Sequence, residues 1–244
     1  MEVRTTCAII LCGGLGTRLS SITQGKPKPM VDVAGRPFLE YQLDYLKSQG
    51  VQRVVMAVSH RREAIETHFG HHYQGLSIEY AIENSPLGTG GAIKNALTNC
   101  QIAANEDILI LNGDTFVEFQ LANLQTEKNL SDALLFIATK EVSDTERYGK
   151  VTFDNQMRIT GFQEKQPGTK GAINAGVYLT TKALLQHLPV QALFSFETDF
   201  LYHQVEQRTL QAHKINGFFI DIGIPEDYHA FCELMQTGQI TCPS

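Results

Sequence analysis

Three glycines and several cationic side chains follow the first apolar run of the chain, in the stretch ILCGGLGTRLSSITQGKPKPM at residues 10–30. Glycines let backbone N–H groups approach phosphate oxygens, and the opposite charge comes from an arginine fork and a lysine ammonium, here Arg18 and Lys28. Pro27 and Pro29 fix φ on both sides of Lys28 and favour extended neighbours, so this lysine projects from a stiff segment. The combination predicts a phosphate-binding loop. The open alternative is a flexible turn with solvated basic residues.

Two common nucleotide-binding patterns do not fit this loop. The dinucleotide pattern GxGxxG, started at Gly14, needs a third glycine where Leu19 stands. The Walker A pattern needs Gly-Lys followed by Ser or Thr, whereas Gly25 and Lys26 are followed by a proline. Neither cofactor class is supported, and Lys26 is expected to be secondary to Lys28.

Two aspartates at the ends of predicted strands are candidates for a metal site. Asp114 follows the apolar run Ile108–Leu111, and Asp221 ends another run before Gly223. A carboxylate just past the carboxyl end of a strand can project over the ligand crevice and hold a hard cation. Either aspartate alone is more often a turn or cap residue. The pair, beside a phosphate-binding loop, indicates a metal site.

The segment PLGTGG at residues 86–91 precedes a predicted helix, and Glu83 lies just before it. Its backbone donors could meet a nucleobase or an anion, or merely form the turn, and we favour the nucleobase. Three histidines, His68, His71 and His72, lack a surrounding set of thiol or carboxylate ligands, so a solvated helix end is the preferred interpretation. No GxSxG nucleophile elbow is present.

The elements that must position these residues alternate between apolar strands and helix-period segments in the first half of the chain. Strands are predicted at 7–11, 53–58, 77–82 and 108–111, and helices at 37–50, 61–69 and 91–97. Further strands are predicted at 133–139, 150–153, 159–164, 172–180, 210–215 and 218–222, and helices at 182–188, at 197–207 and from residue 225 onward. The second half has few helices between its first strands, which indicates antiparallel additions to the sheet.

The predicted fold class is therefore α/β, with one mixed β-sheet flanked by helices in a single domain over residues 1–244. In such a sheet the ligand crevice lies outside the carboxyl ends of the parallel strands. The glycine loop leaves the first of these strands, so it is expected at the crevice.

Composition excludes several classes of protein. The chain has 244 residues, 43% of them hydrophobic and 19% charged, and its net charge of -6 gives no electrostatic footprint for nucleic acid. No stretch reaches the roughly 20 apolar residues that span a membrane, and the start lacks a signal-peptide core, so a cytoplasmic location is expected. The five cysteines are scattered without a CxxC pair, which predicts reduced thiols.

The motifs together resemble those of one family. GGLGTRL, KPKPM and GRP, at 13–19, 26–30 and 35–37, resemble the opening signature of the nucleoside-diphosphate-sugar pyrophosphorylases, the sugar-1-phosphate nucleotidyltransferases. The resemblance continues through ENSPLGTGGA at 83–92, NGD at 112–114, FQEK at 162–165, NAG at 174–176 and DIG at 221–223. Within the family the chain is most similar to the D-glycero-α-D-manno-heptose 1-phosphate guanylyltransferases, with mannose-1-phosphate guanylyltransferases close behind.

This resemblance implies a Rossmann-like (GT-A-like) fold and a reaction. GMP from GTP would pass to D-glycero-α-D-manno-heptose 1-phosphate, with Mg2+ as cofactor and pyrophosphate as the second product. The alternatives are mannose 1-phosphate as acceptor, a uridylyltransferase for another sugar 1-phosphate, and a non-catalytic nucleotide-sugar sensor. A monomer or small homo-oligomer is expected, with no nucleic-acid or membrane partner.

The resemblance also assigns roles to individual residues. Arg18 and Lys28 would be catalytic, Glu164 would hold sugar hydroxyls, and Lys165 would hold the sugar phosphate. Without the resemblance, Glu164 and Lys165 read as a solvated pair at a sheet edge, and residues 174–176 as a β-bulge. The nucleotide-binding set is Leu11, Gly13, Gly14, Gly16, Thr17, Glu83, Gly88 and Thr89. The sugar-phosphate set is Gly149, Glu164, Lys165, Asn174 and Gly176, and the metal ligands are Asp114 and Asp221.

Overall fold

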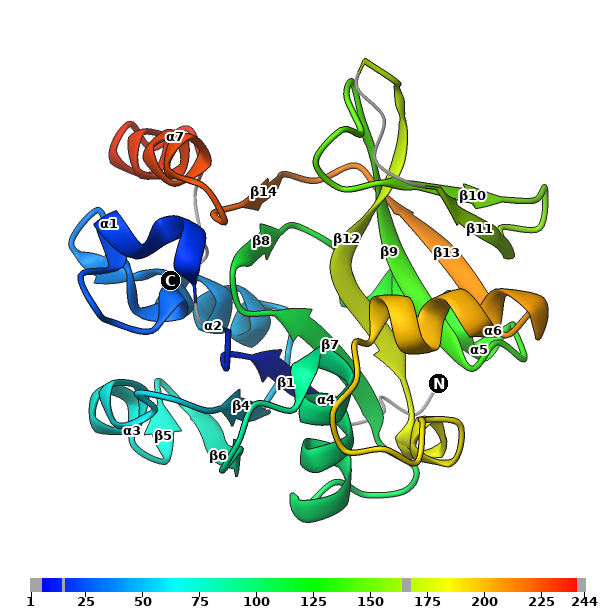
Figure 1. Cartoon of the computed structure of the whole chain (residues 1–244), viewed down its shortest axis with the longest axis horizontal. Helices are drawn as coiled ribbons and strands as arrows, with labels where there is room; N and C mark the ends of the chain where they lie inside the picture. Colours follow the sequence, from blue (N-terminus) through cyan, green and yellow to red (C-terminus); the bar gives the residue numbers. More distant parts are fainter. Residues whose placement is uncertain (1–5, 15, 164–167, 241–244) are drawn as a thin grey trace.

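A computed structural model describes residues 6–14, 16–163 and 168–240 of the chain (Figure 1). Four parallel strands form the half of the main sheet that carries the glycine loop. They are β1 (Thr6–Leu11), β4 (Arg53–Val58), β6 (Leu76–Ile82) and β7 (Asp107–Asn112). Because β1 lies between β4 and β7, the strand order reverses beside β1. Open α/β sheets bind ligands at this switch point.

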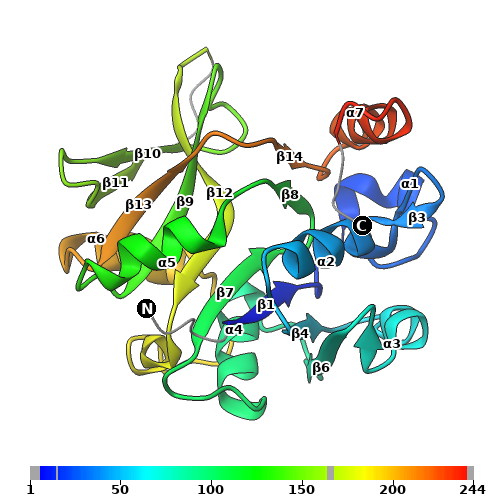
Figure 2. The same cartoon turned by 180° about the vertical axis from the view of Figure 1, so that it is seen from behind.

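The alternation of side chains along β1 explains why the strand is apolar throughout. Ala8 and Ile10 belong to a core cluster that includes α2 (Phe38–Ser48), whereas Cys7 and Ile9 belong to a second cluster that includes α4 (Gly88–Asn99). A strand that is covered on both faces needs an apolar residue at nearly every position. Figures 1 and 2 show α4 on one side of the sheet and α2 on the other.

The second half of the sheet is built mainly from antiparallel pairs, as predicted. Its strands are β9 (Leu135–Val142), β10 (Lys150–Phe153), β11 (Ile159–Gln163), β12 (Gly171–Thr180) and β13 (Leu210–Ile215). The long strand β12 joins the two halves, because it pairs antiparallel with β7, β9 and β10. The one parallel pair in this half is that of β13 with β9, among the strands that the structure describes.

Short elements complete the fold. Before α2 lie 3-10 turns at Thr17–Leu19 and Lys28–Met30, helix α1 (Ser20–Thr23) and the paired strands β2 (Asp32–Val33) and β3 (Arg36–Pro37). Helix α3 (Glu63–Phe69) and strand β5 (His72–Tyr73) follow β4. Strands β8 (Thr115–Val117) and β14 (Phe219–Asp221) pair outside the main sheet, and α7 (Pro225–Gln236) ends the described chain.

Two helical predictions need correction, and one helix was missed. The helix predicted at 182–188 is a 3-10 helix over Lys182–Gln186, and the one predicted at 197–207 is a π-helical turn, Glu197–Leu201, continued by α6 (Tyr202–Glu206). Helix α5 (Leu121–Asn129) was not predicted, because only its Leu121 and Leu124 are buried and they make too short an apolar stripe.

Two further predictions concern the cysteines and membrane-spanning helices. The cysteines within the described residues are free thiols, as predicted, with Cys7, Cys12 and Cys100 buried and Cys232 half-buried. In the same part of the chain, no helix has the length and apolar character that a membrane crossing needs. The prediction of a single domain over residues 1–244 stays a prediction.

Candidate active site

A cavity of about 340 Å³ lies at the carboxyl ends of β1 and β7, next to the switch point of the sheet. Many of the residues predicted from the sequence line it. These are Leu11, Gly13, Gly14, Lys28, Glu83, Gly88, Thr89 and Asp114. The wall is completed by Pro29, Pro86, Ala92, Asn112, Gly113 and Glu197. The structure therefore brings together the glycine loop, the lysine of the KPKPM segment and one of the two aspartates.

Lys28 is the cation of this cavity. Its Nζ atom lies 2.6 Å from Oδ2 of Asp114 and 4.0 Å from Oδ1 of Asp221, and only 10% of its side chain is exposed. Pro27 is extended, with φ −55° and ψ 142°, and a 3-10 turn begins at Lys28. Lys28 was expected to be extended because it precedes Pro29, but it begins this turn, which ends at Met30. Its ammonium lies between two carboxylates.

The other basic residues of the loop lie elsewhere. Arg18 is exposed in the 3-10 turn Thr17–Leu19 and does not line the cavity, and Lys26 is also exposed and outside it. Of Thr17 only this place in the turn is described. Gly16 lies beside Lys28, because a Cβ placed on it would come 3.2 Å from the Lys28 Cβ. The glycine loop therefore packs against the side chain of Lys28. The catalytic role of Arg18 stays a prediction.

The two predicted metal ligands are brought together by strand pairing. In the antiparallel pair of β8 and β14, Asp221 lies opposite Thr115, the residue that follows Asp114. The main chain adds a link, since the N–H of Ile222 donates to the carbonyl oxygen of Asp114 at 2.9 Å. Residues that are more than a hundred positions apart in the sequence therefore lie side by side, with Asp114 in the cavity lining and Asp221 next to it but outside the lining.

The electrostatics of this pair favour a bound cation. Burial raises the pKa of the Asp221 carboxyl, and the Asp114 carboxylate raises it further, while Lys28 and the N–H of Gly223 partly oppose both effects. The Gly223 N–H donates to Asp221 Oδ1 at 2.7 Å. Two carboxylates that repel each other in a partly desolvated place attract positive charge, and Lys28 supplies one such charge here.

Glu83 faces the glycine loop across the other end of the cavity. The N–H of Leu87 donates to its Oε2 at 3.1 Å, and its Oε1 would lie 3.0 Å from a Cβ on Gly13. Gly13 is therefore required by close approach: a side chain there would push against the carboxylate. Burial raises the pKa of Glu83, and the hydrogen bond from Leu87 opposes this. The sequence placed Glu83 near a nucleobase, and the structure places it in the cavity wall.

Of the predicted sugar-phosphate residues, Asn174 and Gly176 lie next to the cavity and outside its lining. Asn174 and Gly176 form the bulge that the residues alone suggested, where the register of β12 against β9 shifts. Gly176 has φ +71°, and a Cβ on it would come 2.6 Å from Nδ2 of Asn112, which does line the cavity. Gly149 is in the loop before β10. Glu164 and Lys165 lie outside the described residues, and the roles of this whole set stay predictions.

Two polar side chains in the wall, Asn112 and Glu197, were not assigned a role from the sequence. Asn112 is part of the NGD motif, so its position beside Asp114 was a usable signal. Glu197 has no such signal, because it lies in an irregular connection far along the chain and reaches the cavity only through tertiary packing.

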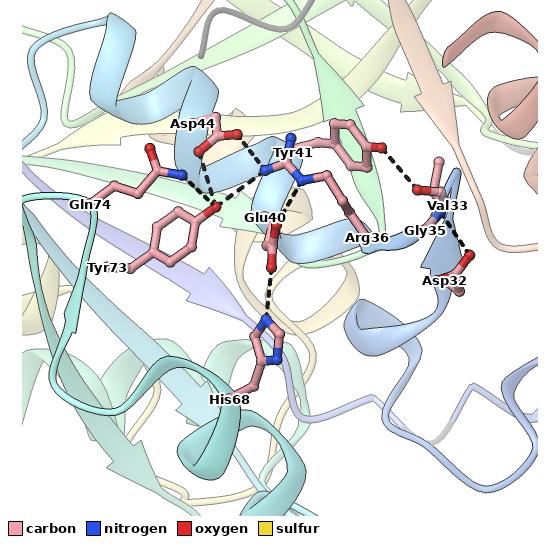
Figure 3. Close-up of polar contacts among 10 residues, drawn as sticks. All are labelled: Asp32, Val33, Gly35, Arg36, Glu40, Tyr41, Asp44, His68, Tyr73 and Gln74. Atoms are coloured by element: carbon pink, nitrogen blue, oxygen red, sulfur yellow. Dashed lines mark hydrogen bonds and ion pairs between the residues drawn. The ribbon is translucent and has the colours of Figure 1, made fainter. Parts of the chain in front are cut away.

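Arg36, from the GRP motif of the family signature, lies in a separate polar cluster (Figure 3). Its guanidinium donates to Glu40 at 2.7 Å, and to Asp44 at 2.6 Å, and contacts the hydroxyl of Tyr73 at 3.2 Å. His68 Nε2 lies 2.7 Å from the other oxygen of Glu40, Oε1. This arginine therefore joins β3 to α2 and β5. His68 is exposed in the last turn of α3, as the sequence suggested, and it also has Glu40 as a partner.

The cluster predicts a pH-dependent stability. Burial alone would raise the pKa of Glu40, but hydrogen bonds from His68 and Arg36 and the Arg36 charge lower it below its ordinary value. A carboxyl whose pKa is lower in the folded than in the unfolded chain stabilises the fold at any pH above the unfolded pKa. This stabilisation is lost as the pH falls through the folded pKa. Glu40→Gln should therefore lower the free energy of unfolding at pH 7 by about 1 to 2 kcal/mol, and this difference should shrink on acidification, as measured by urea denaturation.

Glu66→Gln is the matched control for Glu40→Gln. Glu66 also faces an arginine one turn away, but the pair with Arg62 spans 3.5 Å and about a third of each side chain is exposed. Exposed pairs of this kind contribute less than about 1 kcal/mol. If both variants lose the same stability, or if the Glu40→Gln difference grows as the pH falls, the proposed role of the contacts of Glu40 with Arg36 and His68 is wrong.

The fold and the site together identify the class of protein: the chain belongs to the nucleotidyl transferase family, whose sequence profile matches residues 7–237. It is 44% identical over 224 residues to a D-glycero-alpha-D-manno-heptose 1-phosphate guanylyltransferase of Campylobacter jejuni. The aligned region covers 92% of this chain and 97% of the relative. A protein of the same name from Aneurinibacillus thermoaerophilus is 42% identical over 222 residues, or 91% of this chain and 94% of the relative.

The fold is also similar to that of a solved structure. HddC from Yersinia pseudotuberculosis superposes with a TM-score of 0.80 at 38% sequence identity, covering 94% of this chain and 99% of that protein. The same protein has also been solved as a complex with GMP-PN, which matches with a TM-score of 0.79. The predicted family and the predicted α/β fold are confirmed.

Proposed function

We propose that this protein transfers GMP from GTP to a sugar 1-phosphate, D-glycero-α-D-manno-heptose 1-phosphate above others, and releases pyrophosphate. The observation that carries the proposal is the position of Lys28 between Asp114 and Asp221, where Lys28 and Asp114 line a cavity that a glycine loop borders. The similarity to two heptose 1-phosphate guanylyltransferases and to a structure solved with GMP-PN supports the choice of base and sugar.

The reaction suits a site without a histidine base. A phosphate monoester has a second pKa of about 6, so a sugar 1-phosphate is already largely ionised near neutrality and can attack without a general base. In-line attack of its oxygen on the α-phosphorus of GTP breaks the bond to the leaving pyrophosphate. Catalysis then consists of positioning and charge neutralisation. In this chain, Lys28 neutralises phosphate charge, and Gly13 and Gly14 give the triphosphate close access to the backbone.

The aspartate pair fits a divalent cation, Mg2+ in this proposal. Mg2+ is commonly held by one or two carboxylates together with substrate phosphates. Two carboxylates on either side of Lys28, one of them in the cavity wall, support this proposal. Asp114 and Asp221 would hold the ion, which would supply additional neutralisation of the triphosphate charge.

Glu83 favours guanine over uracil in the proposed base site. An ionised carboxylate only accepts hydrogen bonds. Guanine offers two adjacent donors, N1–H and the N2 amino group, whereas uracil offers a single N3–H between two carbonyl oxygens that a carboxylate repels. With one oxygen bonded to Leu87 and the other beside Gly13, Glu83 provides an acceptor at the cavity wall. The uridylyltransferase alternative lacks such support.

This interpretation predicts a change of base preference in Glu83→Gln. The amide brings a donor to a place where guanine needs acceptors, so the ratio of kcat/KM for GTP over UTP should fall by at least about tenfold. Steady-state pyrophosphate release with each triphosphate measures this ratio. Glu79→Gln is the control, because Glu79 also accepts a main-chain N–H, from Gln101 at 3.2 Å, but does not line the cavity. An unchanged ratio in Glu83→Gln would show that the base is read elsewhere.

The function itself is tested by a substrate panel. The purified protein is incubated with Mg2+, each of GTP, UTP, dTTP, ATP and CTP, and either the heptose, mannose or glucose 1-phosphate, and pyrophosphate release is followed. The proposal expects the highest kcat/KM for GTP with the heptose 1-phosphate, followed by GTP with mannose 1-phosphate. Preference for UTP with glucose 1-phosphate would overturn the base and sugar assignment, and no release from any pair would overturn the enzymatic proposal.

A further inference from the structure

One face of helix α2 carries three polar side chains that hold the segment 112–121. Gln42, Tyr45 and Gln49, the last of which caps the end of the helix, are spaced i, i+3 and i+7 and therefore share one face. Each of them hydrogen-bonds the main chain of this segment. We refer to the three residues as the polar face of α2. The segment that they hold begins with the NGD motif, so it includes Asp114, a proposed metal ligand.

Gln42 is the residue of this face that bonds beside the aspartate. Its Nε2 atom donates to the carbonyl oxygen of Asn112 at 2.8 Å and to that of Thr115 at 2.8 Å. An amide NH2 has two hydrogens, so one nitrogen atom satisfies both carbonyls. The two carbonyls stand on either side of Asp114 in the sequence. Gln42 therefore fixes both ends of the turn that carries the aspartate side chain.

The strands on either side hold the same turn through their main chains. The N–H of Gly113 donates to the carbonyl oxygen of Leu11 at 3.1 Å. The carbonyl oxygen of Asp114 accepts the N–H of Ile222 at 2.9 Å. These bonds follow from the path of the strands and are independent of side-chain identity. The two bonds from Gln42 come from a side chain, so a substitution can remove them while the strand contacts stay.

Burial makes an amide at position 42 costly. The residue is only 3% exposed, and its Oε1 atom has no hydrogen-bond partner within the described part of the chain. A buried acceptor without a partner costs free energy, which an apolar side chain of similar size would avoid. The opposite orientation of the amide would set Oε1 against two carbonyl oxygens, so the NH2 group must face the turn. What the amide contributes is therefore its pair of bonds to the turn.

We propose that Gln42 is a positioning residue for the metal ligand Asp114 and acts through the carbonyl oxygens of Asn112 and Thr115. This inference rests on the proposed function. Gln42 is not among the described residues that line the cavity, so it acts on the ion and the substrates only through the turn. Groups that orient a metal ligand from behind typically change metal affinity about ten- to a hundredfold when they are removed.

The test is Gln42→Met, which keeps the approximate size of the side chain and removes both donors. The Kd of Mn2+ in the presence of GTP, measured by electron paramagnetic resonance, should rise about ten- to a hundredfold. The Kd of GTP without metal, measured by calorimetry, should stay within about twofold, because the glycine loop and Glu83 are not contacted by Gln42. Gln42→Asn keeps an amide that is one methylene too short to reach both carbonyls. It should also weaken Mn2+ binding, and it serves as the test if Gln42→Met does not fold.

Tyr45→Phe and Gln49→Met are the matched controls, because they remove the other contacts of the polar face of α2. The Tyr45 hydroxyl bonds the main chain of Phe119 at 2.6 Å and 2.8 Å, and Oε1 of Gln49 accepts the N–H of Leu121 at 3.1 Å. Both variants should lower Tm and leave the Kd of Mn2+ within about twofold. A purely structural role for Gln42 predicts this same behaviour in Gln42→Met, and that result would overturn the proposal. An equal rise in the Kd of Mn2+ in all three variants would overturn it too.

Failure of this inference can be distinguished from failure of the proposed function. Pyrophosphate release from the unmodified protein with an unchanged Kd of Mn2+ in Gln42→Met overturns only the role of Gln42. Absence of pyrophosphate release, together with weaker Mn2+ binding in Gln42→Met, overturns only the proposed reaction and supports the role of Gln42. If the unmodified protein binds no Mn2+ in the presence of GTP, both the metal site and the role of Gln42 are wrong.

Discussion

Replacing Lys28 with methionine is expected to lower kcat by at least about a hundredfold, with pyrophosphate release as the measurement. That is the scale expected when a positioned charge is removed from a developing anion. Lys28 is the cation that the structure places in the cavity wall, 2.6 Å from Asp114 and 4.0 Å from Asp221. Methionine keeps the part of the side chain that packs beside Gly16 and lacks the ammonium group, so the charge is the main change.

Lys26→Met provides the control for this prediction. Lys26 lies two residues earlier in the same proline-flanked segment, but its side chain is exposed and outside the cavity. Its loss should change kcat by less than about threefold, the scale of a solvated charge. Equal losses in the two variants would mean that the segment acts through its overall charge and that the placement of Lys28 is irrelevant. A melting curve for each variant separates loss of charge from loss of fold.

The parallel half of the fold could be predicted because its signal is local. β1, β4 and β7 are short apolar runs and β6 alternates apolar with polar residues, and the helices between them carry an apolar stripe, so the periodicity alone predicted these four strands. The glycine loop was then placed by a general rule, since ligands bind at the carboxyl ends of such strands. The stiffness of the Lys28 segment was equally local, because proline fixes its own φ and restricts its predecessor.

The rest of the site depends on contacts that no local pattern encodes. Asp114 and Asp221 meet only through the register of β8 against β14, and a shift of one residue would turn Asp221 away. Glu197 reaches the cavity from an irregular turn. Arg36 was included in a signature motif, yet its bonds to Glu40 and Asp44 give it a structural role that the motif did not reveal.

The largest loss is expected when either aspartate becomes asparagine. Asp114→Asn and Asp221→Asn should each lower kcat/KM by on the order of a thousandfold, because a metal ion held against phosphate contributes several kcal/mol of charge stabilisation. The amide keeps the size of the side chain and one oxygen, but it loses the negative charge that attracts a divalent cation. In the unmodified protein, EDTA should abolish turnover and Mg2+ should restore it.

A binding measurement distinguishes loss of the metal from loss of the fold. Mn2+ titrated against the protein with GTP, followed by electron paramagnetic resonance, should show weaker binding in both variants. The Tm of metal-free Asp221→Asn should not fall, since burial and Asp114 already disfavour its charge. Asp132→Asn is the control, because Asp132 is 84% exposed and pairs with Arg158 away from the cavity. Full activity in EDTA, or unchanged rates in both variants, would leave Lys28 to neutralise the triphosphate alone, and the aspartates would then serve only to hold that lysine.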